Sequence, residues 1–452
     1  MEVTAVILAA GQGTRMRSAL PKVLHPLAGR PMLQHCLDAV SGLVTQPPVV
    51  VIGHKGKEVQ AAMGDACRFV LQEEQLGTAH AVQTAEPILK GSVDLVVVAH
   101  ADLPLMLPDT YRRLLEAQKT NSGPVSLVTV ITPEARGFGR IQRSEDGSVT
   151  AIIEEAQASA EQLAINELNV GAYCFNAEWL WGALQRIALS LKGEYYLTDI
   201  VALAAGEGKS VAAVAVLEVD EAVGINNRIH LAEAEAIVRR RINNRWMLAG
   251  VTLIDPPSTY IEAEVEIGPD TVIYPNCHLL GKTRIDEDCS IGPNTIIMDT
   301  IIGKRCTILA SVLEGALLED DVDVGPFGRL RKDAHLANGV HMGNFGEVKR
   351  SYLGPGTKMG HFSYIGDAQI GANVNIGAGT ITCNHDGVRK NRTEIGDNVF
   401  LGSDTMLVAP VKLGEGARTG AGAVVTKDVP PNTLVVGVPA RPLHPVKDDD
   451  GD

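Results

Sequence analysis

The sequence predicts two domains, an α/β doubly wound (Rossmann-like) domain followed by an all-β parallel β-helix, joined by a linker helix. Two observations carry this prediction. Val3 to Ala10 is a continuous apolar run that ends in a glycine-rich turn, as a central strand of a parallel sheet does. From Ile261 to Val425 an aliphatic residue returns at about every sixth position, and this period fits neither an α-helix nor a simple alternating strand.

The six-residue period is the structural unit of the C-terminal half. Each hexad reads as a short strand and a turn, and three hexads close one triangular coil whose aliphatic side chains stack about 4.8 Å apart. The period breaks at residues 309–317, which we interpret as a modest insertion, and at residues 383–394, a longer excursion rich in basic residues. A loop that leaves a regular solenoid is a usual place for a binding function.

The domain boundaries follow from these patterns. We expect the α/β domain over residues 1–227, with further buried strands at Val49–Ile52 and Leu95–Val98. Residues 228–250 show a helical pattern and form the linker, on which the Arg239–Arg241 run is predicted to be a solvated face. The β-helix, with a C-terminal tail, occupies residues 251–452.

Composition excludes several classes of partner. The formal net charge of −14 argues against nucleic acid or an anionic membrane as the main partner, because both call for a basic surface. The 7 cysteines are scattered and form no CxxC pair, which indicates free thiols in a reducing compartment. The apolar start is too short for a transmembrane span and lacks a basic leader. We therefore predict a cytoplasmic protein.

The N-terminal turn is suited to phosphate. Glycine-rich backbone after a buried strand can direct N–H groups at a phosphate, and Arg15 and Lys22 add positive charge. Met16 occupies the third glycine of a GxGxxG pattern and no GxxxxGK[ST] motif occurs, so dinucleotide binding and a P-loop are not indicated. The fuller string LAAGQGTRM…LPK resembles the sugar-nucleotidyltransferases, which transfer a nucleotidyl group from a nucleoside triphosphate to a sugar 1-phosphate.

The resemblance implies the residues of a nucleotide-sugar site. Gln72 to Thr78 match the segment that reads uridine in this family, while Gly139, Glu154 and Asn169 match sugar contacts. The implied UTP and UDP-N-acetylglucosamine residues are Leu8, Ala9, Ala10, Gly11, Gly13, Lys22, Gln72, Gln75, Gly77, Thr78, Gly139, Glu154, Asn169 and Asn226. Arg15 and Lys22 are implied in catalysis, and GEYYLTDI at 193–200 in a wall of the site.

A metal site is implied at the end of a strand. Asp102 follows the apolar run VVVAH, where a carboxylate can hold Mg²⁺ beside phosphates, and Asn226 matches the second ligand of the family. His100 and Ala101 depart from the aromatic residue and glycine that relatives commonly carry there, which leaves their effect on sugar geometry open.

The β-helix carries a second group of reactive residues. Arginine and lysine suit a phosphate, and imidazole suits proton removal near neutral pH. The strings RLRKDA, GNFGEVK, GHFSYIGDAQIG and NIGAGTITCN resemble the bifunctional bacterial N-acetylglucosamine-1-phosphate uridyltransferases that are also glucosamine-1-phosphate N-acetyltransferases. The resemblance covers about residues 3–440 and implies left-handed coils, an exception to the usual right-handed crossover.

The same resemblance assigns roles on the β-helix. It implies His361 as the base of acetyl transfer. It implies glucosamine-1-phosphate contacts at Arg331, Lys349, Tyr364, Asn375, Glu347 and Lys390. It implies acetyl-CoA contacts at Ala378, Asn384, His385, Ser403, Ala421 and Arg441. His385 stands where the family has tyrosine, and the GVPAR segment differs, so the contacts to the coenzyme tail stay open.

These implications predict a bifunctional enzyme. Acetyl-CoA would acetylate glucosamine 1-phosphate, and UTP with Mg²⁺ would then convert the product to UDP-N-acetylglucosamine, with release of pyrophosphate. UDP-N-acetylglucosamine would be a precursor of cell wall and lipopolysaccharide. The family also implies a homotrimer. One alternative is a single-activity nucleotidyltransferase with a structural β-helix. Another is a zinc-binding hexapeptide protein that uses His335, His341 and His361.

Overall fold

The computed structural model describes residues 1–445, and the expected tail from residue 446 on lies outside the described residues. The chain divides into two compact units, Met1–Val238 and a second unit that begins at Arg239. Helix α9 (Arg228–Leu248) runs from the first unit into the second. In the described part of the chain, no helix has both the length and the apolar character needed to cross a membrane.

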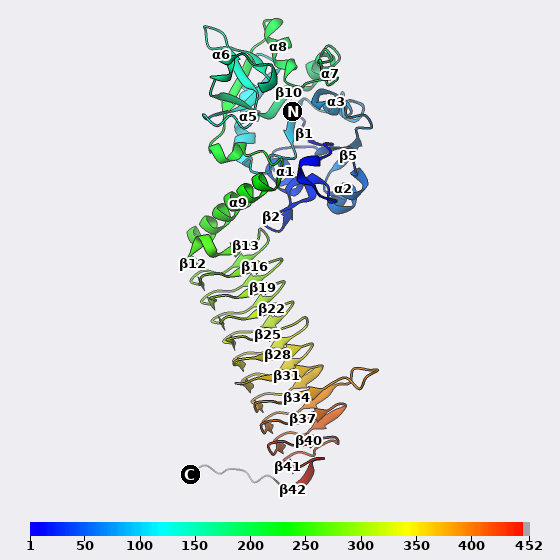
Figure 1. Ribbon diagram of the computed structural model, residues 1–452, viewed down its shortest axis with the longest axis vertical. Coiled ribbons are helices and arrows are strands. Elements are labelled where there is room, and N and C mark those ends of the chain that lie inside the picture. Colours follow the sequence, from blue (N-terminus) through cyan, green and yellow to red (C-terminus); the bar gives the residue numbers. More distant parts are fainter. Residues whose placement is uncertain (446–452) are drawn as a thin grey trace. The chain divides into compact units, whose positions relative to one another are not determined.

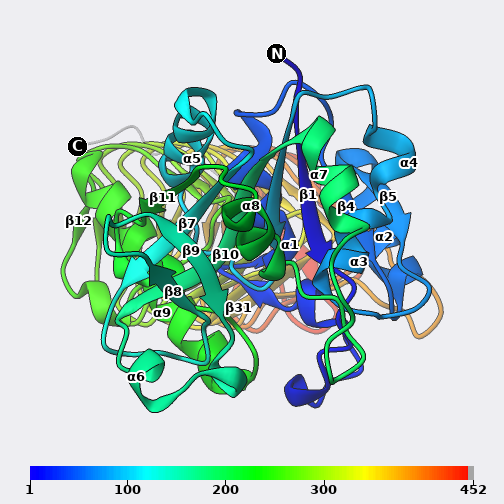
Figure 2. The same ribbon diagram turned by 90° about the horizontal axis from the view of Figure 1, so that it is seen from above.

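A nine-stranded sheet forms the centre of the first unit. Its strands are β1 (Val3–Ala9), β4 (Val49–Ile52), β5 (Arg68–Leu71), β6 (Leu95–His100), β7 (Val125–Ile131), β8 (Arg140–Arg143), β9 (Val149–Ile153), β10 (Glu167–Asn176) and β11 (Val211–Ala215), with a separate ribbon of β2 (Pro26–Leu27) and β3 (Arg30–Pro31). The order is β11-β7-β10-β6-β1-β4-β5, with β8 and β9 attached to β10 (Figure 2). β1 pairs in parallel with β4 and β6, whereas β10 is antiparallel to β6 and β7. The sheet is therefore mixed, although the predicted parallel strands form its middle.

Helices cover both faces of this sheet. They are α1 (Met32–Ser41), α2 (Gly56–Met63), α3 (Thr78–Gln83), α4 (Glu86–Leu89), α5 (Pro108–Thr120), α6 (Ala160–Leu163), α7 (Ala177–Leu184) and α8 (Asp199–Gly206). Alternate side chains of β1 enter two separate cores: Ile7 packs with residues of α1 and α5, and Val6 with residues of α3, α7 and α8. Burial on both faces explains why β1 is apolar throughout.

Three sheets form the β-helix of the second unit, and their strands pair in parallel except for the last strand of sheet C, which is antiparallel (Figure 1). Sheet C contains β12 (Thr252–Leu253), β15 (Val272–Ile273), β18 (Ser290–Ile291), β21 (Thr307–Ile308), β24 (Asp323–Val324), β27 (His341–Met342), β30 (Lys358–Met359), β33 (Asn375–Ile376), β36 (Phe400–Leu401), β39 (Arg418–Thr419), β41 (Thr433–Val436) and β42 (Arg441–Pro445). Sheet D contains β13 (Tyr260–Ile261), β16 (His278–Leu280), β19 (Ile296–Met298), β22 (Val312–Glu314), β25 (Arg329–Leu330), β28 (Gly346–Lys349), β31 (Ser363–Gly366), β34 (Ile381–Cys383), β37 (Met406–Val408) and β40 (Val424–Val425). Sheet E contains β14 (Glu266–Ile267), β17 (Arg284–Ile285), β20 (Ile301–Ile302), β23 (Leu317–Leu318), β26 (His335–Leu336), β29 (Tyr352–Leu353), β32 (Ala368–Ile370), β35 (Thr393–Ile395) and β38 (Val411–Leu413).

The predicted hexad residues fill the interior of the coils. Leu279, Ile297, Leu330 and Val348 all lie on sheet D and are fully buried. Each stacks on its counterpart in the next coil through the parallel register, as Leu279 does on Ile297. Burial of one aliphatic side chain contributes roughly 1.5–3 kcal/mol, so this repeat is the main stabilising feature of the unit.

The interpretation of residues 309–317 as an insertion is wrong. Leu313 in β22 is fully buried and pairs with Ile297 below and Leu330 above. The sequence passes from Ile308 to Leu313 and then to Leu318 in two steps of five. Each step shortens a corner by one residue and leaves the inward position unchanged, so this segment belongs to the regular stack.

The excursion after β34 is a loop that projects from the coils (Figure 1). His385 and Lys390 form an antiparallel bridge across it. The backbone N–H groups of Arg389 and Val388 donate to Asp386 and lower the pKa of this carboxyl to about 2. A charged turn of this kind fixes the loop at its tip.

Candidate active sites

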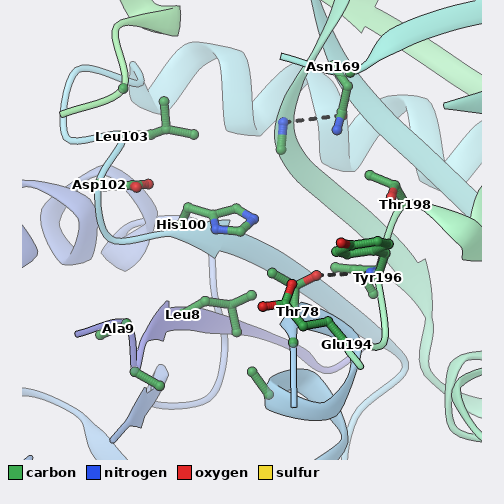
Figure 3. Close-up of a pocket in the computed structure, with 18 of the residues that line it drawn as sticks. Leu8, Ala9, Thr78, His100, Asp102, Leu103, Asn169, Glu194, Tyr196 and Thr198 are labelled. Atoms are coloured by element: carbon green, nitrogen blue, oxygen red, sulfur yellow. Dashed lines mark hydrogen bonds between the residues drawn. The ribbon is translucent and has the colours of Figure 1, made fainter. Parts of the chain in front are cut away.

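A cleft of about 540 Å³ opens at the carboxyl ends of β1 and β6 in the first unit (Figure 3). Leu8 and Ala9 lie on β1, and His100 and Asp102 lie at the end of β6. This volume falls within the range of small-molecule sites. The predicted residues that line the cleft are Leu8, Ala9, Ala10, Gly11, Lys22, Gln72, Gln75, Gly77, Thr78, Asp102, Gly139, Glu154, Asn169 and Asn226, whereas Gly13 and Arg15 do not line it.

The glycine-rich turn requires glycine at position 13. Gly13 has φ +62°, and a Cβ there would lie 2.6 Å from the Cβ of Lys22, which is too close for any other residue. Gly13 therefore acts by letting Lys22 pack against the turn. Arg15 is held at the site from outside the lining, because its Nη2 donates to Asn226 Oδ1 at 2.9 Å.

Lys22, Asp102 and Asn226 form one charged cluster. Nζ of Lys22 donates to Asp102 Oδ2 at 2.8 Å and to Asn226 Oδ1 at 3.1 Å. Burial opposes ionisation of Asp102, but the Lys22 ammonium and His100 outweigh it, and the pKa of Asp102 is lowered. Asp102 is thus a carboxylate at neutral pH, and its negative charge offsets the positive charge of Lys22.

The oxygen atoms of this cluster suit Mg²⁺. Asp102 Oδ2 and Asn226 Oδ1 both lie within hydrogen-bond distance of the same Lys22 nitrogen, so they border one shared space. Mg²⁺ binds through one or two such oxygens while water and substrate phosphates complete its shell. Among the residues that the structure describes, no group of three or more His, Cys, Asp or Glu could hold a metal alone.

The predicted base-reading segment is closed by the 193–200 segment. Thr78 Oγ1 accepts from the N–H of Leu197 at 2.9 Å, and Gly77, at φ +102°, would place a Cβ 2.6 Å from the carbonyl oxygen of Tyr195. Gln75 Nε2 donates to the Ala10 carbonyl at 2.7 Å. Four residues of the predicted wall line the cleft: Glu194, Tyr196, Leu197 and Thr198.

Gly139, Glu154 and Asn169 form the opposite part of the lining. The Asn169 N–H donates to the Gly139 carbonyl at 2.8 Å. Asn169 Nδ2 donates to the Tyr173 hydroxyl at 2.8 Å, and Glu154 Oε1 accepts from the Thr198 hydroxyl at 2.8 Å. A carboxylate, an amide and a bare backbone in one cleft can bind the hydroxyl groups of a sugar.

Several lining residues were missed by sequence reasoning. They are Val23, Ala81, Leu103, Gly137, Phe138, Val170, Gly171, Tyr173 and Gly224. Phe138 and Val170 are chain neighbours of predicted residues, so adjacency to a motif could have found them. Tyr173 carried no signal, because its role depends on the hydrogen bond from Asn169 across a bulge in β10.

Three of the six predicted sugar-phosphate residues lie on sheet D, namely Glu347, Lys349 and Tyr364, and Arg331 directly follows its strand β25. Glu347 on β28 pairs in register with Tyr364 on β31, and Arg331 Nη1 donates to Glu347 Oε1 at 2.9 Å. The positive charges of Lys390 and Arg331 lower the pKa of Lys349. The crowding of three cations here indicates a place where an anion would be stabilised.

Four other predicted residues lie along one corner of the coils. His361, Ala378, Ser403 and Ala421 each follow the glycine of successive coils between sheets C and D, and backbone hydrogen bonds connect this corner from coil to coil. His361 is exposed, while its inward neighbours Met359 and Ile365 are fully buried. Small side chains above His361 leave an open edge along the corner.

The remaining predicted residues are dispersed. Asn375 lies on β33 of sheet C, not on sheet D with Tyr364. Asn384 is buried at the base of the projecting loop and donates to Asp367, whereas His385 is exposed on the loop. Arg441 is exposed at the start of β42. One copy of the chain thus does not bring Asn375 and Tyr364 onto one face.

The positions of the histidines do not favour the zinc alternative. His335 lies on sheet E and contacts Glu319 at 2.8 Å. His341 lies on sheet C and contacts Asp323. Because the two imidazoles point outward from different sheets, they do not form a tetrahedral site with His361.

The fold and these sites define a transferase with a nucleotidyltransferase-like α/β unit and a hexapeptide β-helix. Residues 5–163 match the family model of the MobA-like NTP transferase domain, and residues 264–299 and 392–427 match that of the bacterial transferase hexapeptide. The hexapeptide match indicates the left-handed form of the β-helix.

Curated relatives identify the family. "Bifunctional protein GlmU" of Heliobacterium modesticaldum is 46% identical over 434 residues, which cover 96% of this chain and 95% of the relative. "Bifunctional protein GlmU" of Pelobacter propionicus is 46% identical over 440 residues, with 96% and 95% covered. A solved structure of UDP-glucose pyrophosphorylase complexed with UDP-glucose aligns with a TM-score of 0.44 and 17% identity, over 53% of this chain and 100% of that one. The chain belongs to the bifunctional GlmU family.

Proposed function

We propose that this bifunctional enzyme makes UDP-N-acetylglucosamine. Acetyl transfer from acetyl-CoA to glucosamine 1-phosphate takes place on the β-helix, and uridylyl transfer from UTP to N-acetylglucosamine 1-phosphate takes place in the α/β unit. The observation that carries the proposal is the 46% identity with bifunctional relatives across 96% of the chain. The product would supply cell-wall and lipopolysaccharide synthesis, and we propose a cytoplasmic location.

In uridylyl transfer, the sugar phosphate oxygen attacks the α-phosphorus of UTP in line and pyrophosphate leaves. Lys22 is the proposed counter-charge for this departure, with Arg15 beside it. The Lys22 ammonium donates to the carboxylate of Asp102 at 2.8 Å. Positioned cations of this kind stabilise charge that develops in the transition state, and no protein nucleophile is required.

Asp102 and Asn226 are the proposed ligands of Mg²⁺. The metal, when bound, neutralises phosphate charge. Phosphates of UTP would complete its shell, because the two residues supply only two of its ligands. Lys22 would then exchange its bond to Asp102 for one to a phosphate. The low pKa of Asp102 keeps this ligand charged.

In acetyl transfer, His361 is the proposed general base. It takes a proton from the ammonium group of glucosamine 1-phosphate, so the free amine can attack the thioester carbon while the CoA thiolate leaves. Arg331, Lys349 and Lys390 are the proposed phosphate contacts. The coenzyme would lie along the corner formed by Ala378, Ser403 and Ala421, whose side chains are too small to block it.

A homotrimer would complete the acetyl site. Asn375 on sheet C and Tyr364 on sheet D project from different faces of one prism. If both contact one small sugar phosphate, one of them must come from a neighbouring copy. This separation supports an assembly in which each acetyl site is shared.

One assay tests the proposed function. Purified protein with Mg²⁺, UTP, acetyl-CoA and glucosamine 1-phosphate should release both free CoA and pyrophosphate. Omission of acetyl-CoA should suppress most of the pyrophosphate release, because the uridylyl acceptor is the acetylated sugar phosphate, and this acceptor does not form without acetyl-CoA. CoA release that stays at background would favour the single-activity alternative.

A further inference from the structure

Arg140 is a buried cation directly behind the sugar half of the cleft. It begins β8, and its side chain is only 3% exposed. Nη1 donates to the carbonyl oxygen of Phe138 and to Glu155 Oε2, the latter at 3.0 Å. Among the described residues, its buried Nε has no hydrogen-bond partner. Burying an arginine is costly unless its charge is paired and its N–H groups are hydrogen-bonded, so the bonds to Phe138 and Glu155 are the interactions that offset this cost.

Its neighbours are the three segments that supply the sugar contacts. Gly139 precedes Arg140 in the chain. Arg140 pairs in register with Ile153 on β9, next to Glu154, and with Leu168 on β10, next to Asn169. The Glu155 carboxylate that Arg140 binds directly follows Glu154. The guanidinium thus binds the chain beside Gly139 and beside Glu154, and the backbone of Arg140 pairs with the strand that carries Asn169.

The backbone around Arg140 has little room for adjustment. A Cβ on Gly139 would lie 2.7 Å from Ile152 Cγ2. The Gly139 carbonyl already accepts from Asn169 N–H at 2.8 Å. Loss of the bonds to Phe138 and Glu155 would remove side-chain support from the loop before Gly139 and from the turn after Glu154.

We propose that Arg140 is a positioning residue for the sugar half of the uridylyl site. It acts by holding Gly139 and Glu154 at a fixed separation, and it touches no substrate itself. The inference rests on the proposed uridylyl transfer. The nucleotide half of the cleft comes from other segments, residues 8–22 and 72–78, so the effect of Arg140 should fall on the sugar phosphate and spare UTP.

Arg143 provides a matched control on the same strand. It also binds a glutamate, with Nε and Nη2 donating to Glu167 at 2.8 and 2.7 Å. Its side chain is 37% exposed, and it does not line the cleft. Arg143→Met therefore removes an arginine–glutamate pair from the same strand, β8, without touching the loop before Gly139.

The experiment compares Arg140→Met, Arg140→Lys and Arg143→Met in the full-length protein. Steady-state pyrophosphate release gives KM for N-acetylglucosamine 1-phosphate and for UTP separately, and CoA release from the same preparation reports on the other site. We expect Arg140→Met to raise KM for the sugar phosphate about 10- to 100-fold. KM for UTP should stay within about threefold, and Arg140→Lys should recover much of the loss because it keeps the buried charge.

The outcomes separate this inference from the proposed function. Wild-type protein without pyrophosphate release would overturn the proposed function and this inference with it. An active wild type with an unchanged sugar-phosphate KM in Arg140→Met, or an equal rise in Arg143→Met, would overturn the positioning role alone. If Arg140→Met fails to fold, Glu155→Gln is measured instead, because it breaks the same ion pair by changing its exposed member. An unchanged KM for the sugar phosphate in Glu155→Gln would also overturn the positioning role.

Discussion

Replacement of His361 by alanine should remove acetyl transfer without disturbing the fold. The imidazole is exposed at a corner of the coils, while Met359 and Ile365 fill the interior on either side of it. His361→Ala leaves these core contacts intact, and a surface substitution of this kind usually changes the free energy of unfolding by less than about 0.5 kcal/mol. Any large effect on rate would therefore report on chemistry.

The size of the effect follows from the role of a base. Loss of a general base typically lowers the rate by about 10²- to 10⁴-fold, or about 2.7 to 5.4 kcal/mol in activation free energy. Uridylyl transfer with supplied N-acetylglucosamine 1-phosphate should stay within about twofold, because distant sites rarely couple strongly. Raising the pH should partly rescue the variant, since more substrate amine then arrives deprotonated.

Release of CoA from acetyl-CoA measures the outcome, with His278→Ala as control. His278 lies on sheet D, five coils from Tyr364, where it stacks on Tyr260 at 4.6 Å, and its removal should change acetylation by less than about twofold. Near-normal CoA release by His361→Ala across the pH range would refute the assignment. His341 would then be the next candidate, because its Nε2 lies 4.0 Å from where a Cβ of Gly360 would sit and its Nδ1 contacts Asp323.

Three further predictions concern the charges and the assembly. Asp102→Asn should lower pyrophosphate release roughly 100-fold or more, because a metal ligand contributes several kcal/mol, and should leave CoA release intact; unchanged uridylyl transfer at ordinary Mg²⁺ would mean that the metal is held elsewhere. Because Lys390 lowers the pKa of Lys349, binding of N-acetylglucosamine 1-phosphate to the β-helix should weaken as pH rises through that lowered pKa. In Lys390→Met the sugar phosphate should bind more weakly at neutral pH, but the pH at which binding is lost should be higher, because the pKa of Lys349 is then less lowered. Calorimetric titrations that show no shift of this pH would contradict the proposed cluster. Sedimentation at micromolar concentration should show a trimer, and a monomer with full acetylation activity would disprove the shared site.

The repeat made the β-helix predictable because each inward position obeys one local rule. The spacing rule gave a wrong interpretation where the corners are one residue shorter. Between Ile308 and Leu318 the six-residue period is lost, and the segment looks like an insertion unless Leu313 is recognised as an inward residue. Thr382 shows a second limit: it takes an inward position and satisfies its hydroxyl on the backbone of Gly366. A polar residue in that place interrupts the aliphatic period without interrupting the coil.

The α/β site was predictable where residues act through chain neighbours and unpredictable where they act through space. The string around Lys22 indicated phosphate binding, but its bonds to Asp102 and Asn226 join segments 80 and 204 residues away. Arg140 gave no signal in the sequence beyond a charge in a short strand. Its burial depends on how β8, β9 and β10 meet, and such long-range pairing leaves no local pattern.

The uniform stacking of the coils makes the length of the prism a variable that evolution can change in whole steps. The coils from Tyr260 to Val324 carry none of the residues proposed for acetyl transfer. Arg284 pairs with Ile301 in the next coil, so Thr300 holds the same position in its coil as Thr283 does in the coil before. Removing residues 283–299 would therefore join Lys282 to Thr300 without changing the register. Ile302 would then meet Ile267, and the prism would be shorter by one coil, about 4.8 Å. Adding or removing a coil at one end of the β-helix would leave the acetyl-transfer residues in the other coils unchanged. The length of the β-helix and its catalytic residues can therefore evolve independently.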